Sequence, residues 1–119
     1  MLERLEAVIA GRAGGDPATS YSARLTADPP LAARKLGEEA VELVVAALAQ
    51  ERAAVVGEAA DLLFHLVALL TGKGVSVAEV FAELERREGV SGLAEKAGRP
   101  SPLPAQAAPG SPAPANGRG

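Results

Sequence analysis

Five acidic residues in two short motifs are the part of this sequence best suited to chemistry. The first motif reads Glu38-Glu39-x-x-Glu42 and the second reads Glu58-x-x-Asp61. Residues three apart lie on one face of a helix, one turn along, so each motif can point two carboxylates in the same direction. If the two segments form neighbouring antiparallel helices, Glu39 and Glu42 can face the same volume as Glu58 and Asp61.

Such a cluster of carboxylates requires a cation. Two carboxylates about 4 Å apart repel each other by roughly 4 kcal/mol at an effective dielectric constant of about 20. The chain has no cysteine, so the ligands are oxygen atoms, which favour a hard ion, Mg²⁺ first and Mn²⁺ second. We therefore predict a metal site at Glu39, Glu42, Glu58 and Asp61. The alternative is a solvated surface or a set of salt bridges, which fits poorly with the apolar residues around the second motif.

Glu38 and two basic residues before it have two interpretations each. Glu38 can position or deprotonate a metal-bound water, or it can pair with Arg34 one turn earlier. Lys35 lies on the acidic arc and can contact a phosphate, or it can form an i,i+4 salt bridge with Glu39, which is worth only about 0.2–0.5 kcal/mol. The sequence leaves these alternatives open.

A second group of candidates lies around one histidine and one tyrosine. His65 shares the helical arc of the second acidic motif, one to two turns further along. A place in the core or at a subunit interface is favoured for His65 over a contact to the site. Ser20, Tyr21 and Arg24, in a segment rich in Gly and Pro, can line the mouth of the site as substrate-binding residues.

Composition restricts the class of protein. A chain of 119 residues is one domain with a modest core, and its Ala, Leu and Val content with 3% aromatic residues favours packed helices over a β-sandwich. The net charge is −3 and no basic stripe is visible, which argues against nucleic-acid binding. The start of the chain lacks the pattern of a signal peptide. The longest apolar stretch, 62–70, contains His65 and is too short to span a bilayer, so we expect a cytoplasmic protein without a membrane segment.

Four helices are expected from the apolar periodicity. The first ends at Gly11, the second runs from about Pro30 to Gln50, the third from about Ala53 to Thr71, and the fourth follows a capping box at Ser76–Glu79 and ends by Gly89. Residues 13–30 between the first two are expected to be loop.

The third of these helices is apolar almost all round, which indicates burial on several sides. We therefore expect an all-α four-helix bundle, residues 1–96, that is completed by homodimerisation. Residues 97–119 are rich in Pro, Ala and Gly and are expected to be a disordered tail.

The motifs resemble those of the MazG-type all-α nucleotide pyrophosphohydrolases, whose signature is E-E-x-x-E, a spacer and E-x-x-D. The local sequence is most similar to that of the phosphoribosyl-ATP pyrophosphohydrolase branch of histidine biosynthesis, which has the motifs S-Y-T-x-x-L, K-x-G-E-E-x-x-E and E-x-A-D-L-x-[YF]-H-L. The matching segments are 20–25, 35–42 and 58–66, and Ser22 stands where Thr is usual. The resemblance covers about residues 2–88 and implies a MazG-like bundle. The Pro-rich tail is extra.

The resemblance implies cleavage of the α–β phosphoanhydride of phosphoribosyl-ATP to phosphoribosyl-AMP and pyrophosphate. It implies Mg²⁺ held by Glu39, Glu42, Glu58 and Asp61, which would let an acidic pocket accept a triphosphate. The substrate can bring one or two further Mg²⁺ ions. Candidates for the remaining roles are Glu38 toward water and, toward phosphate, Lys35, Arg34 and Arg24.

Three alternatives remain beside this interpretation. A house-cleaning hydrolase of other nucleoside triphosphates would share the metal site and differ in the loop around Tyr21. A di-iron bundle would need Glu-x-x-His pairs, and the chain has a single histidine. A non-catalytic helical interaction module would lack hydrolysis altogether.

Overall fold

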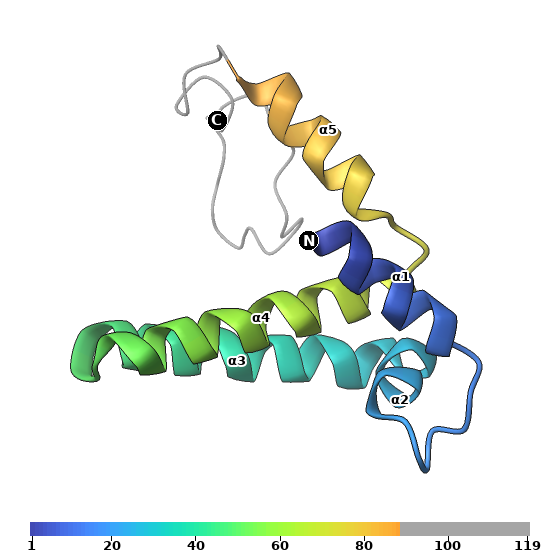
Figure 1. The fold of residues 1–119 in the computed structure, drawn as a ribbon, viewed down its shortest axis with the longest axis horizontal. Coiled ribbons are helices and arrows are strands. Elements are labelled where there is room, and N and C mark those ends of the chain that lie inside the picture. The colour runs from blue at the N-terminus through green and yellow to red at the C-terminus, as the bar shows by residue number, and fades with distance from the viewer. Residues whose placement is uncertain (89–119) are drawn as a thin grey trace, which may run out of the picture. The chain divides into compact units, whose positions relative to one another are not determined.

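The computed structural model describes residues 1–88, and within that range it contains helices and no strand. Five helices follow one another: α1 (Leu2–Arg12), α2 (Tyr21–Ala27), α3 (Pro29–Ala49), α4 (Arg52–Gly72) and α5 (Val77–Arg87) (Figure 1). The all-α prediction is confirmed. The predicted tail at 97–119 lies outside the described residues, and Met1–Leu84 form one compact unit.

The prediction of a loop throughout residues 13–30 is wrong, because helix α2 lies within them. Ser20 is the N-cap of this helix, and its hydroxyl accepts a hydrogen bond from the backbone N–H of Ala23 at 3.2 Å. Its apolar face is short, but Leu25 is completely buried. A capped start and the burial of Ser22, Ala23 and Leu25 hold this helix of 7 residues against the others.

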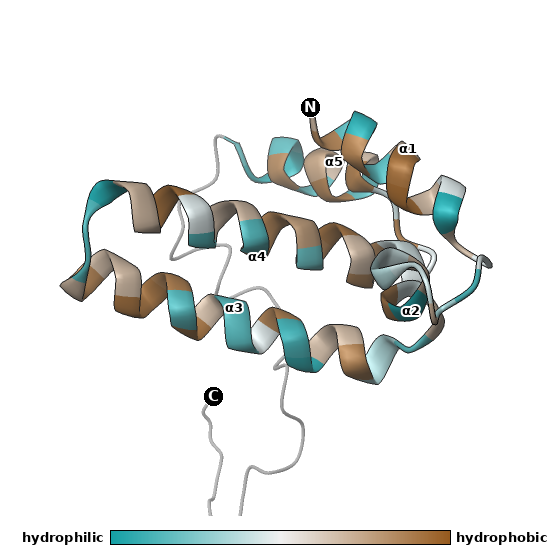
Figure 2. Ribbon diagram, turned by 60° about the horizontal axis from the view of Figure 1, so that its bottom comes forward, coloured by the Kyte–Doolittle hydropathy of each residue, from teal (hydrophilic) through white to brown (hydrophobic). Residues whose placement is uncertain are grey.

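A long antiparallel hairpin of α3 and α4 positions the two acidic motifs. Helix α3 begins at Pro29 after the N-cap Asp28, whose carboxylate accepts from the backbone N–H of Leu31 at 3.2 Å. Gln50 and Glu51 alone connect α3 to α4, so the two helices run back along each other (Figure 2). Antiparallel neighbours of equal length place the middle of one beside the middle of the other, which is where both motifs lie.

The core lies at one end of this hairpin, where α1 and α2 pack against α4. Gly72 marks the tightest approach, because a Cβ atom at this position would lie 2.9 Å from the backbone carbonyl oxygen of Thr26. The buried apolar side chains come from all five helices: Ile9, Leu25, Ala32, Val67, Ala68 and Val77.

Helix α5 begins with the predicted capping box, which is confirmed. The Ser76 hydroxyl accepts from the backbone N–H of Glu79 at 3.2 Å, and the Glu79 carboxylate accepts from the backbone N–H of Ser76 at 3.0 Å. Glu6 of α1 adds a further acceptor for the backbone N–H of Val77, at 2.8 Å. These bonds satisfy amide groups that have no partner inside the helix.

Helix α4 has the bounds and the apolar character that the sequence predicted, but its length changes the comparison with a membrane span. By length and composition alone, Arg52–Gly72 is able to cross a membrane, whereas the prediction considered only residues 62–70. A core helix of a soluble protein has the same properties, and here Glu58 and Asp61 interrupt the apolar surface near the middle of the helix. Acidic groups at that depth of a bilayer are costly.

Apolar side chains also remain exposed along the hairpin, away from the core. Leu48 near the end of α3 is 83% exposed. The others on these two helices are Val41, Val44, Val45, Val56 and Leu63.

Candidate metal and substrate site

Three of the predicted ligands converge between α3 and α4. Carboxylate oxygens of Glu39, Glu58 and Asp61 all lie within 4.8 Å of one another. Glu39 comes from α3, and the other two come from successive turns of α4. Glu39 and Glu58 are half-buried and Asp61 is exposed, so the cluster has a solvent-facing side through which a ligand can enter.

The inner oxygens of this cluster have no partner among the described residues. Oε1 of Glu39 and Oε1 of Glu58 are both buried, and neither accepts a hydrogen bond. A buried polar atom without a partner costs free energy, and a charged one costs more. Two such oxygens on residues of one acidic cluster fit a bound cation, since oxygen ligands are those that Mg²⁺ prefers.

Glu42, the fourth predicted ligand, is exposed and is not one of the three residues whose oxygens converge, but it influences the ionisation of Glu58. Burial, then a hydrogen bond with Glu42 and the charge of Glu42, raise the pKa of Glu58, and the charges of Glu39 and Asp61 raise it further. A hydrogen bond between two carboxyl groups requires a proton on one of them. Without a cation, therefore, the site favours binding a proton to offset its own charge.

Glu38 lies outside this cluster and pairs with the two basic residues before it. Its Oε2 lies 3.8 Å from Nε of Arg34, and its Oε1 lies 3.5 Å from Nζ of Lys35. Both pairs are at the surface, where such pairs contribute about 0–1 kcal/mol. The ion-pair alternative for Glu38 is the one present in this structure, and Lys35 bonds Glu38 and not Glu39.

Tyr21 and His65 connect α2 to the turn of α4 that carries Asp61. His65 is 7% exposed, its Nδ1 lies 2.7 Å from the backbone oxygen of Asp61, and its Nε2 lies 2.8 Å from the Tyr21 hydroxyl. A carbonyl oxygen only accepts, so Nδ1 carries the hydrogen, and in the neutral ring Nε2 accepts from Tyr21. The Tyr21 ring also stacks on Phe64 with centroids 6.1 Å apart. His65 is thus buried, as the sequence favoured, and its two ring nitrogens contact Tyr21 and the backbone of Asp61.

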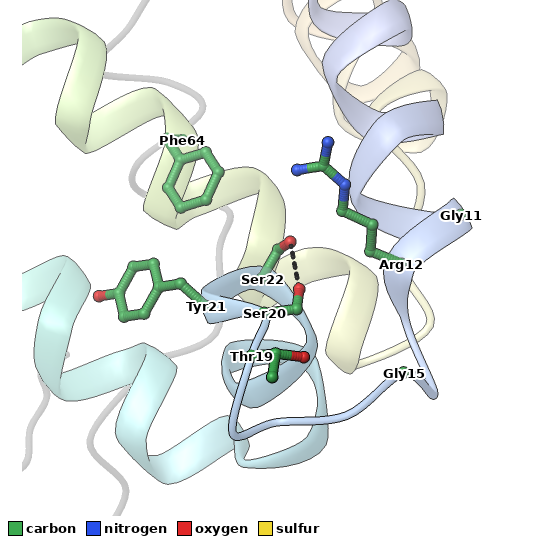
Figure 3. A pocket seen from close by; sticks show the side chains of 8 residues that line it. All are labelled: Gly11, Arg12, Gly15, Thr19, Ser20, Tyr21, Ser22 and Phe64. Carbon is green, nitrogen blue, oxygen red and sulfur yellow. Dashed lines mark hydrogen bonds between the residues drawn. The ribbon is translucent and has the colours of Figure 1, made fainter.

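A pocket of about 470 Å³ opens beside the first residues of α2 (Figure 3). Ser20 and Tyr21 line it, as the sequence suggested for the mouth of the site, but Arg24 does not, because its Nε donates to the backbone oxygen of Pro17 at 3.5 Å. The lining residues are Gly11, Arg12, Gly15, Thr19, Ser20, Tyr21, Ser22 and Phe64.

Arg12 belongs to this pocket, although its sequence context did not single it out. Its guanidinium extends toward the space between Phe64 and the hydroxyls of Ser20 and Ser22 (Figure 3). The available signal was weak: a basic residue that ends α1 directly before a glycine-rich segment. A basic residue at a helix C-terminus is common for reasons of the helix dipole alone.

Comparison with known proteins gives one consistent result. Residues 2–88 match the family model described as phosphoribosyl-ATP pyrophosphohydrolase. A phosphoribosyl-ATP pyrophosphatase of Rhizorhabdus wittichii is 62% identical over 100 residues, which cover 83% of this chain and 94% of that protein. Proteins of the same name from Caulobacter vibrioides and Novosphingobium aromaticivorans are 58% and 59% identical, with 83% of this chain covered in each case and 92% and 94% of the relative.

Proposed function

The chain belongs to the phosphoribosyl-ATP pyrophosphohydrolase family, and we propose that it hydrolyses phosphoribosyl-ATP to phosphoribosyl-AMP and pyrophosphate in histidine biosynthesis. The reaction takes place at a Mg²⁺ site formed by Glu39, Glu42, Glu58 and Asp61. The observation that carries this proposal is the pair of buried, unpartnered carboxylate oxygens on Glu39 and Glu58, which require a positive charge.

The four acids contribute to the ion site in different ways. Glu39 and Glu58 offer the buried oxygens, and Asp61 closes the solvent-facing side. Glu42, next to Glu58, would supply the fourth carboxylate, and the ion would compete with any proton that the acids hold. When bound, Mg²⁺ supplies the charge that lets this acidic site accept a triphosphate, and it polarises the phosphoryl oxygen. Mn²⁺ is the second choice for the same ligands.

The basic residues and Glu38 act on the outer side of the site. Arg34 and Lys35 release Glu38 at low cost, because exposed ion pairs are weak, and then contact the phosphates. Glu38, freed in this way, orients the attacking water. Direct attack by water needs no nucleophilic Ser or Cys, and the chain has no cysteine.

We further propose that a second copy of the chain covers the exposed apolar side chains of α3 and α4. Six exposed apolar residues lie on these two helices, with Leu48 at 83% exposure, and large exposed apolar surfaces commonly mark protein–protein interfaces. A homodimer buries them with the same surface on both subunits. It also removes the reason to place α4 in a membrane, and we place the enzyme in the cytoplasm.

Sedimentation of the wild type and of Leu48→Glu tests the dimer. The wild type is expected to sediment at twice the mass of the chain and the variant at the mass of the monomer. Val8→Glu, on exposed apolar surface of α1, is the matched control and should remain dimeric. A monomeric wild type at micromolar concentration contradicts the proposal.

Pyrophosphate release from phosphoribosyl-ATP with and without Mg²⁺ tests the activity itself. The same assay with dUTP, dCTP and ATP distinguishes the proposed activity from that of a house-cleaning hydrolase. Faster turnover of one of these than of phosphoribosyl-ATP would contradict the assignment of phosphoribosyl-ATP as the substrate. Absence of hydrolysis of all four would contradict the assignment of the chain as a hydrolase.

A further inference from the structure

We infer that the pocket around Arg12 binds the 5′-phosphate of the substrate's phosphoribosyl group. This inference rests on the proposed function and adds a specificity-determining residue to it. Phosphoribosyl-ATP carries phosphate at two ends: a triphosphate on the adenosine and a phosphate monoester on the added ribose. The enzyme therefore needs two separate places for phosphate, and the acidic cluster serves only the end that arrives with Mg²⁺.

The pocket has the chemistry that a sugar phosphate requires. Its volume of about 470 Å³ lies within the usual range of ligand sites, about 300–1,000 Å³. None of its lining residues is acidic, and it combines one guanidinium with the hydroxyls of Thr19, Ser20 and Ser22. Ser20 and Ser22 lie 3.4 Å apart at their Oγ atoms, so both can turn toward the hydroxyls or phosphate oxygens of one ligand.

Arg12 is the cation in this region that is free to bind an anion. Among the described residues no carboxylate oxygen lies within 4 Å of its guanidinium, and Arg12 lines the pocket, whereas Arg34 and Lys35 lie beside Glu38 on α3 and do not line it. Arg24 bonds a backbone oxygen outside the pocket. A planar guanidinium recognises phosphate through two parallel N–H bonds, and that of Arg12 extends into the pocket (Figure 3).

The pocket is also placed correctly relative to the acids. Phe64 forms one wall and follows Asp61 on α4 by three residues, which is about 4.5 Å along a helix. Tyr21 forms another wall, and its hydroxyl reaches His65, which bonds the backbone of Asp61. A ligand in the pocket and a triphosphate on the acids are therefore neighbours along one helix. Arg12 distinguishes phosphoribosyl-ATP from ATP, which lacks the second phosphate end.

Kinetics of Arg12→Gln on two substrates tests this inference. The KM for phosphoribosyl-ATP should rise about tenfold or more from the loss of a charged hydrogen bond, with kcat little changed. The rate of any ATP hydrolysis should not change. Arg4→Gln, at an exposed position on the same helix, removes the same charge outside the pocket and should leave both KM values unchanged.

An unchanged KM in an active Arg12→Gln enzyme overturns the inference and leaves the proposed function intact. A lower melting temperature with an unchanged KM overturns it as well, since Arg12 would then serve only the end of α1. If the wild type fails to hydrolyse phosphoribosyl-ATP, the proposed function fails first. Binding of ribose 5-phosphate, followed by NMR, then tests whether the pocket binds a sugar phosphate. Loss of binding in Arg12→Gln supports the inference, and absence of binding to the wild type overturns it.

Discussion

The hydroxyl of Tyr21 on α2 lies 2.8 Å from Nε2 of His65 on α4. The other ring nitrogen of His65 donates to the backbone oxygen of Asp61, so this pair connects the segment before the hairpin to the acidic turn. The contact explains why a tyrosine in a loop-like stretch and a histidine in an apolar helix belong to one site. The Asp61 carbonyl oxygen places the hydrogen of His65 on Nδ1, and the Tyr21 hydroxyl bonds the other ring nitrogen.

Tyr21→Phe tests this connection, because it removes the hydroxyl and keeps the ring that stacks on Phe64. The buried Nε2 of His65 loses its partner, which is expected to lower the free energy of unfolding by about 1–3 kcal/mol. Urea denaturation measures the change. In a His65→Gln background the same substitution should cost much less. Equal costs in both backgrounds would show that the hydrogen bond is not the cause.

Glu58→Gln is expected to stabilise the metal-free protein. Burial and the neighbouring Glu42 raise the pKa of Glu58, so the charge on Glu58 lowers the free energy of unfolding as the pH rises from the unfolded pKa toward the raised folded pKa. A neutral Gln removes this cost. Melting in EDTA should therefore give a higher Tm for the variant than for the wild type, while Mg²⁺ should raise the Tm of the wild type alone. A lower Tm in EDTA would contradict a crowded acidic site.

The matched control for that experiment is Glu51→Gln, at the exposed first position before α4. It removes one negative charge next to the same helix at a distance from the cluster. A similar rise of Tm in this control would show that the stabilisation by Glu58→Gln comes from the change in net charge and not from the acidic cluster.

Glu79, in the capping box of α5, makes the stability of the fold depend on pH. Hydrogen bonds from the backbone and side chain of Ser76 lower the pKa of Glu79 below 4.5. A lowered pKa in the folded state contributes stability above the unfolded value, and this contribution is lost as the pH falls through the folded value. Glu79→Gln should thus be less stable than the wild type at pH 7 and approach it in acid below pH 4.5. Parallel stability curves over this range would contradict the capping role.

Gly72→Ala tests the packing of α4 against α2. Its new Cβ would lie 2.9 Å from the backbone oxygen of Thr26, and backbone cannot move aside as a flexible side chain can. We expect a loss of about 1–3 kcal/mol from overpacking, measured by urea denaturation. Gly11→Ala has no atom within 4 Å of its Cβ and should be neutral or slightly stabilising. A neutral Gly72→Ala would contradict the close approach.

The hairpin was predictable because its signals are local and repeated. A proline after Asp28, an apolar face on the first helix, a second helix that is apolar almost all round and a two-residue connection define both helices to within one residue at each end. Helical periodicity placed Glu39, Glu58 and Asp61 on facing sides of the two helices. The Ser76–Glu79 capping box is a four-residue sequence pattern and could be predicted equally well.

The region around α2 and the Arg12 pocket was not predictable in the same way. Helix α2 has 7 residues, too few to show a helical period, and its stability depends on the tertiary burial of Leu25. The pocket combines the end of α1, the segment before α2 and Phe64 of α4, three stretches that only the tertiary fold brings together. Helical spacing allows Glu38 to pair with Arg34 at i,i+4 and with Lys35 at i,i+3, whereas the choice of Glu38 over Glu39 as the partner of Lys35 depends on side-chain geometry.

The most direct test of the acidic site is pyrophosphate release from phosphoribosyl-ATP by the wild type, Glu39→Gln and Glu51→Gln at millimolar Mg²⁺. Glu39→Gln keeps the shape of the side chain and removes one metal ligand, so its rate should fall by roughly 100-fold or more. The wild type and Glu51→Gln should be equally active and should both lose activity in EDTA. Hydrolysis by Glu39→Gln at the wild-type rate, or hydrolysis by the wild type that persists in EDTA, would contradict a catalytic ion held by these carboxylates.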